Sequence, residues 1–229
     1  RADPKRIGLN SVYRKNLLNN RNITVGLNFN RQSTHYFNVL DDLLGGDFWV
    51  DIDQFADRDF DDPIISQNDL STPNKVAKEG DVIGWDYNIV TRATSLFGQY
   101  EKKWQKVEVY AAAHLAQTSF RRDGNVQNGR FPETSEGKGE SQDFLTGGIK
   151  AGATYKITGR QFIVANAAYL NRPPSPRNSF LSARTRPDVI PGLQSESVYT
   201  GDIGYVVRYA RLKARATFYY TKMMDQMWS

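Results

Sequence analysis

The chain has 229 residues, of which 12% are aromatic and 24% charged, and its mean hydropathy is −0.59. No stretch approaches the roughly 18 consecutive apolar residues that a membrane-spanning helix requires. The formal charge of +5 is spread along the chain, which argues against a nucleic-acid-binding stripe. Cysteine is absent, which excludes disulfides, thiolate metal sites and cysteine nucleophiles. Low mean hydropathy does not exclude membrane strands, because these need only about ten residues with every second one apolar.

Period-two alternation of apolar and polar residues predicts strands along most of the chain, and helical spacing is scarce. The pattern is clearest at 23–31, where Ile, Val, Leu and Phe occupy odd positions and Thr, Gly and Asn occupy even ones, so each set takes one face of a sheet. The same alternation occurs, in chain order, at 7–13, 107–115, 149–155, 203–209 and 212–221. We expect about eight strands in total. The parity places four basic or titratable side chains on the polar face: His114, Lys150, Lys213 and Arg215.

The long segment 83–103 is interpreted as a single strand, because two strands there would disturb the order of the connections described below. Within this segment the parity of the apolar residues changes, which predicts a β-bulge in the strand. The first set is Trp85, Tyr87 and Ile89, and the second is Leu96, Gly98 and Tyr100.

The connections alternate strictly between short and long. Short ones lie near 18–22, 104–106, 157–160 and 210–211, and polar loops at about 37–81, 121–142 and 171–199. An up-and-down membrane barrel has this arrangement, with tight turns on the periplasmic side and long loops outside the cell. The sequence therefore predicts an all-β, transmembrane, antiparallel up-and-down β-barrel fold over residues 1–229. Four aromatics near the short turns fit an interfacial girdle, although strand propensity alone also explains them: Tyr13, Trp104, Tyr155 and Tyr209.

Three segments lie around the last long loop: NRPPS at 171–175, PGLQSE at 191–196 and GDIG at 201–204. Together they resemble the C-terminal barrel signature of TonB-dependent outer-membrane receptors, with Asp202 where glutamate is more usual. The segments at 41–49, 54–60, 122–125 and 128–132 are similar to Bacteroidetes members of that family.

The resemblance implies a barrel of 22 strands around an N-terminal plug domain, in the outer membrane of a Gram-negative bacterium. No plug is visible in 1–229, residues 1–6 have no signal-peptide core, and Trp228–Ser229 does not resemble a closing strand. We therefore expect about eight strands of a larger barrel. The implied function is import of an external ligand, with energy from an inner-membrane TonB-type protein acting through the plug. Outer-membrane lipid, lipopolysaccharide and a surface lipoprotein are the further partners expected, and the substrate (glycan, peptide or metal chelate) stays open.

The acidic loop 47–62 is a candidate calcium site, because clustered carboxylates suit a hard cation. Its spacing fails as an EF-hand, since Ala56 replaces the required glycine and Phe55 an oxygen ligand. The alternative is a solvated loop held by its interleaved aromatics. The candidate calcium ligands are Asp51, Asp53, Asp57 and Asp59.

Arginines between 172 and 186 are candidates for contacting an anionic ligand or lipopolysaccharide phosphates, with a proline-ordered loop as the alternative. The ligand-contact candidates are Phe48, Trp49, Arg172, Arg177 and Arg184. No nucleophile elbow, phosphate loop or paired-carboxylate signature is present, so we expect neither an enzyme nor a cofactor. Two alternative functions are a non-transporting barrel (porin or adhesin) and a soluble β-sandwich binding module.

Overall fold

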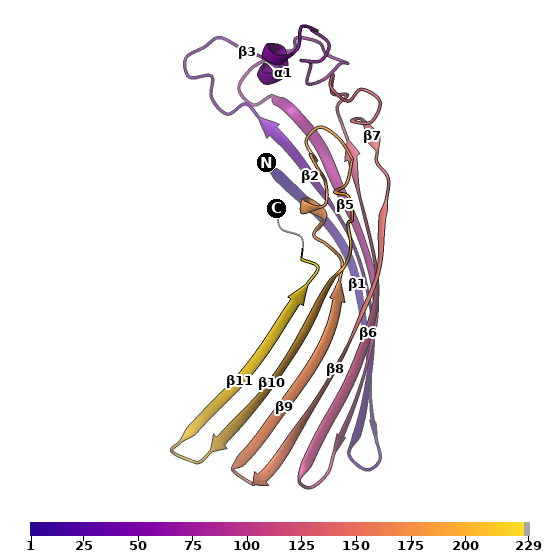
Figure 1. Cartoon of the computed structure of the whole chain (residues 1–229), viewed down its shortest axis with the longest axis vertical. Helices are drawn as coiled ribbons and strands as arrows, with labels where there is room; N and C mark the ends of the chain where they lie inside the picture. Colours follow the sequence, from indigo (N-terminus) through magenta and orange to yellow (C-terminus); the bar gives the residue numbers. More distant parts are fainter. Residues whose placement is uncertain (227–229) are drawn as a thin grey trace.

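Eight long antiparallel strands follow one another in a single curved sheet (Figure 1). The structure, a computed structural model, describes residues 1–226, so the expectation for Trp228–Ser229 lies outside the described residues. The sheet order is the chain order, with the short β7 (Gly137–Lys138) paired to β6. The strands are β1 (Ala2–Leu17), β2 (Arg21–Val39), β5 (Val82–Lys103), β6 (Val107–Gly124), β8 (Gln142–Thr158), β9 (Gln161–Arg172), β10 (Glu196–Arg208) and β11 (Lys213–Met224).

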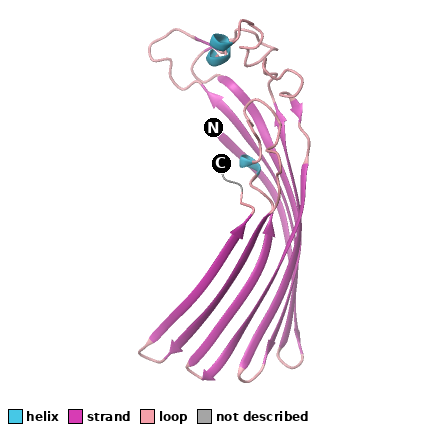
Figure 2. Cartoon of the chain, viewed as in Figure 1, coloured by secondary structure: helices cyan, strands magenta, loops and turns pink. Residues whose placement is uncertain are grey.

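The connections place short turns at one end of the sheet and long loops at the other (Figure 1). Figure 2 shows helix only within these loops: α1 (Gln54–Asp59) and the 3₁₀ turn η1 (Pro176–Asn178). The first long loop also holds a two-stranded sheet of β3 (Trp49–Val50) and β4 (Val76–Ala77). Among the described residues no helix is long and apolar enough to cross a membrane, a finding that has no bearing on crossing by strands.

The predicted antiparallel, up-and-down barrel fold with about eight strands is confirmed. The β-sandwich alternative is wrong, because the described residues form one large sheet beside the small β3–β4 pair, and a sandwich needs two large sheets packed face to face. Each of the long strands from β1 to β10 pairs with the long strand that follows it in the sequence, as in the wall of a barrel.

The first hairpin shows how local sequence sets the short turns. Asn19 and Asn20, between β1 and β2, have φ of 62° and 55°. The connection has three residues, because Leu17 pairs with Arg21, and its last two residues take the left-handed backbone conformation that asparagine tolerates. The register from Ala2↔Tyr36 to Leu17↔Arg21 then runs without a shift.

The register defines two faces of the sheet, because directly opposite residues of antiparallel strands point to the same side. On the outer face, uncharged side chains are exposed in adjacent strands, among them Leu27, Leu96, Leu115, Ile149, Ile203 and Phe218. The inner face is polar, and its parity includes the predicted set His114, Lys150, Lys213 and Arg215. An inner-face ladder joins three strands: the Tyr110 hydroxyl donates to Asn166 Oδ1 at 3.0 Å, and Asn166 Nδ2 donates to Asp202 Oδ1 at 3.0 Å.

The parity change in β5 has a different cause from the one predicted. The segment is one strand, as expected, but its register with β6 is continuous from Tyr87 to Lys103, so the predicted bulge between the two apolar sets is wrong. The irregularity lies earlier, where Phe37 opposes Asp86 and Asn38 opposes Ile83. The apolar residues instead change faces: Leu96 is on the outer face, whereas Tyr87 and Ile89 are on the inner face, where they are buried.

Candidate functional site

The first and second long loops form one connected cap at their end of the sheet. Between the first and second loops, the Leu70 amide donates to the Gln127 carbonyl at 2.8 Å, and the Gly129 amide donates to the Gln67 carbonyl at 2.9 Å. A side chain at Gly129 would collide with the carbonyl of Ile64, so only glycine permits this approach. The cap is therefore a packed structure with its own hydrogen bonds.

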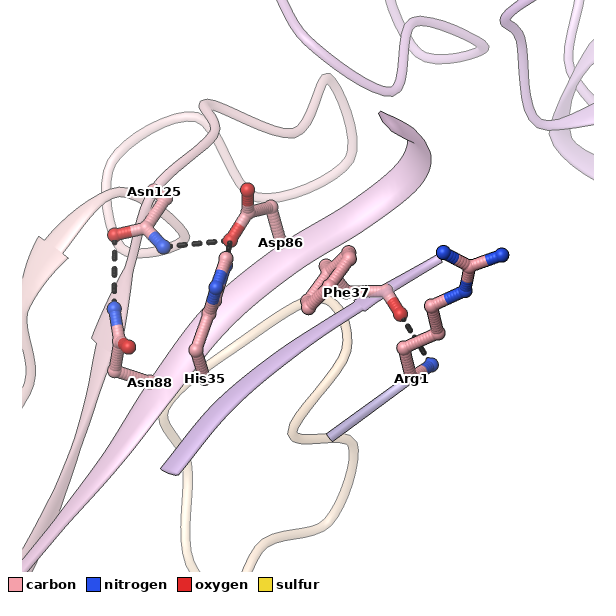
Figure 3. A network of polar contacts seen from close by, with 6 residues as sticks. All are labelled: Arg1, His35, Phe37, Asp86, Asn88 and Asn125. Carbon is pink, nitrogen blue, oxygen red and sulfur yellow. Dashed lines mark hydrogen bonds and ion pairs between the residues drawn. The ribbon is translucent and has the colours of Figure 1, made fainter. Parts of the chain in front are cut away.

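A polar network holds the rim of this cap to the strands (Figure 3). His35 Nε2 lies 2.6 Å from Asp86 Oδ1, which also accepts from Asn125 Nδ2 at 2.6 Å. Asn88 Nδ2 donates to Asn125 Oδ1 at 3.2 Å. The network joins β2, β5 and the first residue of the second loop, so the loop leaves β6 in a defined direction.

The third long loop folds back onto the inner face rather than away from the sheet. Phe180 packs edge-on against Phe120 of β6, with ring centroids 6.0 Å apart. Tyr87 of β5 stacks on Tyr36 of β2 at 5.3 Å. Phe180, Phe120, Tyr87 and Ile89 form a cluster of buried apolar side chains. The partly buried members around it are Tyr36, Trp85, Phe144, Ala183, Val189 and Leu193.

Arg122, on the inner face of β6, is the central polar residue of this region. It is 1% exposed, and its guanidinium donates through Nε to the Ala183 carbonyl and through Nη1 to the Ser135 carbonyl, both at 2.6 Å. Its Cζ lies 5.4 Å from the ring centroid of Tyr87. The Nη2 atom is buried and has no hydrogen-bond partner among the described residues. Arg122 thus connects the second and third loops to the sheet, and its Nη2 group is left without an acceptor among the described residues.

Burial changes the pKa values of Arg122 and Tyr87. Both residues lie at the loop end of the sheet, beyond the apolar band of the outer face. Burial lowers the pKa of Arg122, and the neighbouring Tyr87 and Asp123 oppose that change. Burial raises the pKa of Tyr87, with Tyr36 adding to the rise and nearby arginines opposing it. A desolvated cation beside aromatic faces is an environment that favours an incoming anion.

Two of the predicted ligand-contact arginines are brought to the same place. Arg184 Cζ lies 5.3 Å from the ring centroid of Trp85, and Arg184 is exposed. Arg177, in η1, is also exposed and acts electrostatically on Tyr87. We name this region the arginine–aromatic vestibule. It consists of the exposed Arg177 and Arg184, the partly buried Trp85, and the buried Tyr87 and Arg122 beneath them.

The other three predicted contacts are not part of the vestibule. Arg172 forms an ion pair with Glu196, with Nη2 and Oε2 2.7 Å apart, at the point where β9 and β10 diverge. Phe48 is 55% exposed and Trp49 37% exposed, at the start of the β3–β4 sheet. These two aromatics remain accessible on the first loop.

Three of the four candidate calcium ligands have separate structural roles, and the fourth, Asp57, is exposed in the first turn of α1. Asp51 is buried and accepts from Asn68 Nδ2 at 2.7 Å and from the Gly84 amide at 2.8 Å. Asp53 caps α1 by accepting from the amides of Phe55 and Ala56, and Asp59 pairs with Arg58. Within residues 1–226 no group of three or more His, Cys, Asp or Glu side chains converges on a point that would hold a metal. The structure therefore does not bring the four carboxylates together.

A large hollow lies elsewhere, on the outer face. It measures about 920 Å³ and is bordered by Tyr100, Tyr169 and Tyr199. Its floor is made of small residues on adjacent strands: Gly98, Ala111, Ala113, Ala151 and Ala167. Because this hollow is apolar and faces away from the vestibule, it belongs to the surface that surrounds the barrel.

Comparison with solved structures supports the same fold, whereas no family model and no curated protein matches the chain. The copper transporter OprC superposes with a TM-score of 0.67 and 9% identity, over 98% of this chain and 30% of that one. The ferric-catecholate import receptor Fiu of E. coli K12 superposes in its closed form with a TM-score of 0.62 and 15% identity, over 98% and 32% of the two chains. Its open form gives 0.52 and 14%, over 89% and 27%. The chain spans about a third of the length of these structures, and at such identity the likeness establishes the fold alone.

Sequence reasoning missed the sheet residues of the vestibule. Tyr87 and Arg122 lie at the loop end of strands whose remaining inner-face residues are mostly polar. The signal that marked them was the parity change in β5, because apolar residues on a polar face need a cover. That cover is the third loop.

Proposed function

We propose that this chain forms part of the wall of a TonB-dependent outer-membrane receptor that binds an external ligand through its loops and imports it. The observation that carries the proposal is the arginine–aromatic vestibule, on the inner face of a barrel-type sheet and beneath the long loops. The long loops are then extracellular and the short turns periplasmic. Energy would come from an inner-membrane TonB-type protein acting through a plug domain, and no enzymatic step or cofactor is part of the proposal.

The chemistry of the vestibule favours an anionic ligand with flat or aromatic parts. Arg177 and Arg184 are exposed, and the described residues offer neither of them a carboxylate partner. Guanidinium groups bind carboxylate and phosphate through paired hydrogen bonds, and aromatic rings stack on planar ligands. An anionic metal chelate fits better than a neutral glycan, whereas a peptide would fit through its carboxylates. The exposed pair Phe48 and Trp49 supplies a second contact on the first loop.

The test is uptake by cells that express the full-length protein, with ferric catecholate, a copper complex and a neutral oligosaccharide as probes. We expect uptake of the anionic chelate that disappears when the inner-membrane energy coupling is removed. The double variant Arg177→Gln/Arg184→Gln should weaken binding about 10- to 100-fold, from two lost charge-assisted contacts. The matched control, Arg58→Gln/Lys138→Gln, removes the same charge from other exposed loop positions.

The passive-barrel alternative makes a different prediction. A porin passes small solutes without energy coupling, and an adhesin binds a partner without uptake. Energy-independent flux, or binding with no accumulation inside the cell, would replace the transport proposal. The further partners that we propose are outer-membrane lipid, lipopolysaccharide and a surface lipoprotein.

A further inference from the structure

Three basic side chains lie together on the outer face, just beyond its apolar residues on the side of the long loops. Arg31 of β2 lies directly opposite Arg92 of β5, and both are exposed. Lys5 of β1 is also exposed and stands one step diagonal to Arg31, because Arg31 pairs with Ile7. We call these three residues the upper basic row.

The positive charges of the upper basic row repel one another in the chain by itself. Like charges directly opposite each other on antiparallel strands destabilise the pairing. Within residues 1–226 none of the three side chains forms a hydrogen bond or ion pair that would offset the repulsion. Arg121, on the neighbouring strand, is by contrast neutralised by Asp123 at 2.8 Å. The upper basic row is therefore a cationic surface without its counter-charge.

The same three strands carry a second basic row at the end with the short turns. Arg21 of β2 lies directly opposite Lys102 of β5, and Lys15 of β1 is diagonal to Arg21. Arg21 Nε is buried with no partner among the described residues, and Lys102 Nζ lies 4.5 Å from the ring centroid of Trp104. We call these the lower basic row.

On each strand the two rows stand ten positions apart: Lys5 and Lys15, Arg31 and Arg21, Arg92 and Lys102. Ten residues of strand measure roughly 34 Å, and a tilt of about 45° reduces this to a height of roughly 24 Å. The apolar band of an outer-membrane barrel is about 25 Å tall. The outer-face positions between the rows carry no charge: Ile7, Leu9, Ser11 and Tyr13 on β1, Ile23, Val25, Leu27 and Phe29 on β2, Thr94, Leu96, Gly98 and Tyr100 on β5.

We propose that the outer face of β1, β2 and β5 is a binding surface for membrane lipids that carry anionic phosphate groups, with one basic row at each headgroup level and acyl chains along the uncharged residues between them. The inference deepens the proposed function, on which it rests for the position of the sheet in a membrane. The lipid phosphate supplies the missing counter-charge of each row. A free anion would not account for the second row at the thickness of a hydrocarbon layer, nor for the exposed apolar surface between the rows.

The surface is confined to these three strands. At the level of the lower row, the next strands present Val109, Ala153 and Ala165 on the outer face. At the level of the upper row they present Ser119 and Asp143. On the three strands themselves, the outer-face carboxylates beyond the upper row are Asp3, two positions past Lys5, and Asp86 of β5, which is bonded to His35 and Asn125. Lipid binding is therefore expected to be stronger on one side of the barrel.

The experiment measures lipid affinity of the purified full-length protein in a neutral detergent, by native mass spectrometry and by the shift in Tm. The probes are phosphatidylglycerol, phosphatidylcholine and inorganic phosphate. We expect phosphatidylglycerol to bind and raise the Tm, phosphatidylcholine to bind more weakly, and inorganic phosphate to have no effect. Lys5→Gln/Arg31→Gln/Arg92→Gln should raise the Kd of the upper site for phosphatidylglycerol about a hundredfold and leave the lower site unchanged, which native mass spectrometry shows as the loss of one of two bound lipids. Lys15→Gln/Arg21→Gln/Lys102→Gln should do the reverse.

The control Lys150→Gln/Lys213→Gln/Arg215→Gln removes equal charge from the inner face and should leave the affinity within about twofold of the wild type. Arg31→Gln/Arg92→Gln serves as a second variant, which removes the opposed pair alone and is expected to fold at least as well as the wild type. Affinity retained in both upper-row variants, equal loss in the inner-face control, or a full Tm shift with phosphate alone would overturn the proposal. Failure of the proposed function is separate, since it shows as absent uptake whether or not lipid binds.

Discussion

Arg122 Nη1 lies 2.6 Å from the carbonyl oxygen of Ser135, although the two residues belong to a strand and to the loop that follows it. The same guanidinium holds Ala183 of the third loop. One buried side chain therefore sets the position of two loops relative to the sheet. The arginine–aromatic vestibule depends on this single anchor.

Replacing Arg122 should release both loops while the sheet stays intact. Arg122→Met keeps much of the side-chain volume but removes two hydrogen bonds to carbonyls, each worth about 1.5–3 kcal/mol for a charged donor. We expect faster proteolysis within 125–141 and 173–195 and a lower Tm. The control is Arg121→Met, the adjacent arginine whose partner is Asp123 on its own strand. Equal proteolysis of the two variants would contradict the anchoring role.

A second prediction concerns the contact between the first and second loops. Gly129→Ala should separate them, because the new methyl group would overlap the carbonyl of Ile64. The expected loss of stability in the cap is about 1–3 kcal/mol, typical of overpacking. Hydrogen exchange at Leu70 and Gly129, whose amides bond across the contact, measures the effect. Gly159→Ala, where a Cβ meets no atom within 4 Å, should leave that exchange unchanged.

The assignment of the two faces is tested by introducing a charge at neighbouring positions of β5. Leu96→Arg places the charge on the outer face, at a cost of about 2–4 kcal/mol near the middle of a bilayer. Ser95→Arg places it on the inner face, where water is expected, and should cost much less. Urea unfolding of the full-length protein from lipid vesicles gives both values. The outer-face assignment fails if Ser95→Arg is the more damaging change.

The acidic loop should depend on Asp51 and not on a metal. Asp51→Ala leaves the Asn68 amide group and the Gly84 amide, both partly buried, without their acceptor, at a cost of about 1–3 kcal/mol. Asp57→Ala, at an exposed position, serves as the control. A chelator should leave the Tm of the wild type unchanged. A chelator-induced drop in Tm that calcium restores would return the calcium site to consideration.

The sheet was predictable because its signals are local. Period-two alternation identifies the strands, and the two asparagines at 19 and 20 specify a tight turn within a few residues of sequence. The alternation of short and long connections predicts the up-and-down topology. The structure has that topology, because each long strand pairs with the next long strand. The single strand at 83–103 followed from that same order.

The vestibule was only partly predictable, because its contacts join distant segments. Arg177 and Arg184 stood out as arginines in a proline-containing loop, but Arg122 bonds to Ala183 across 61 positions of sequence. Periodicity cannot show which strand a loop will cover. The parity change in β5 was visible and was interpreted as a bulge, since a bulge and a covered inner face produce the same pattern in the sequence.

The sequential pairing of the strands also implies an order of folding. The four hairpins with short turns (β1–β2, β5–β6, β8–β9 and β10–β11) can form from residues close together in the chain, so only the long loops need costly closures. The contact of Arg122 with the third loop cannot form until β8 and β9 have been added and the chain has turned toward β10. The vestibule then assembles after the hairpins that it joins, and unfolding should begin there while the hairpins persist.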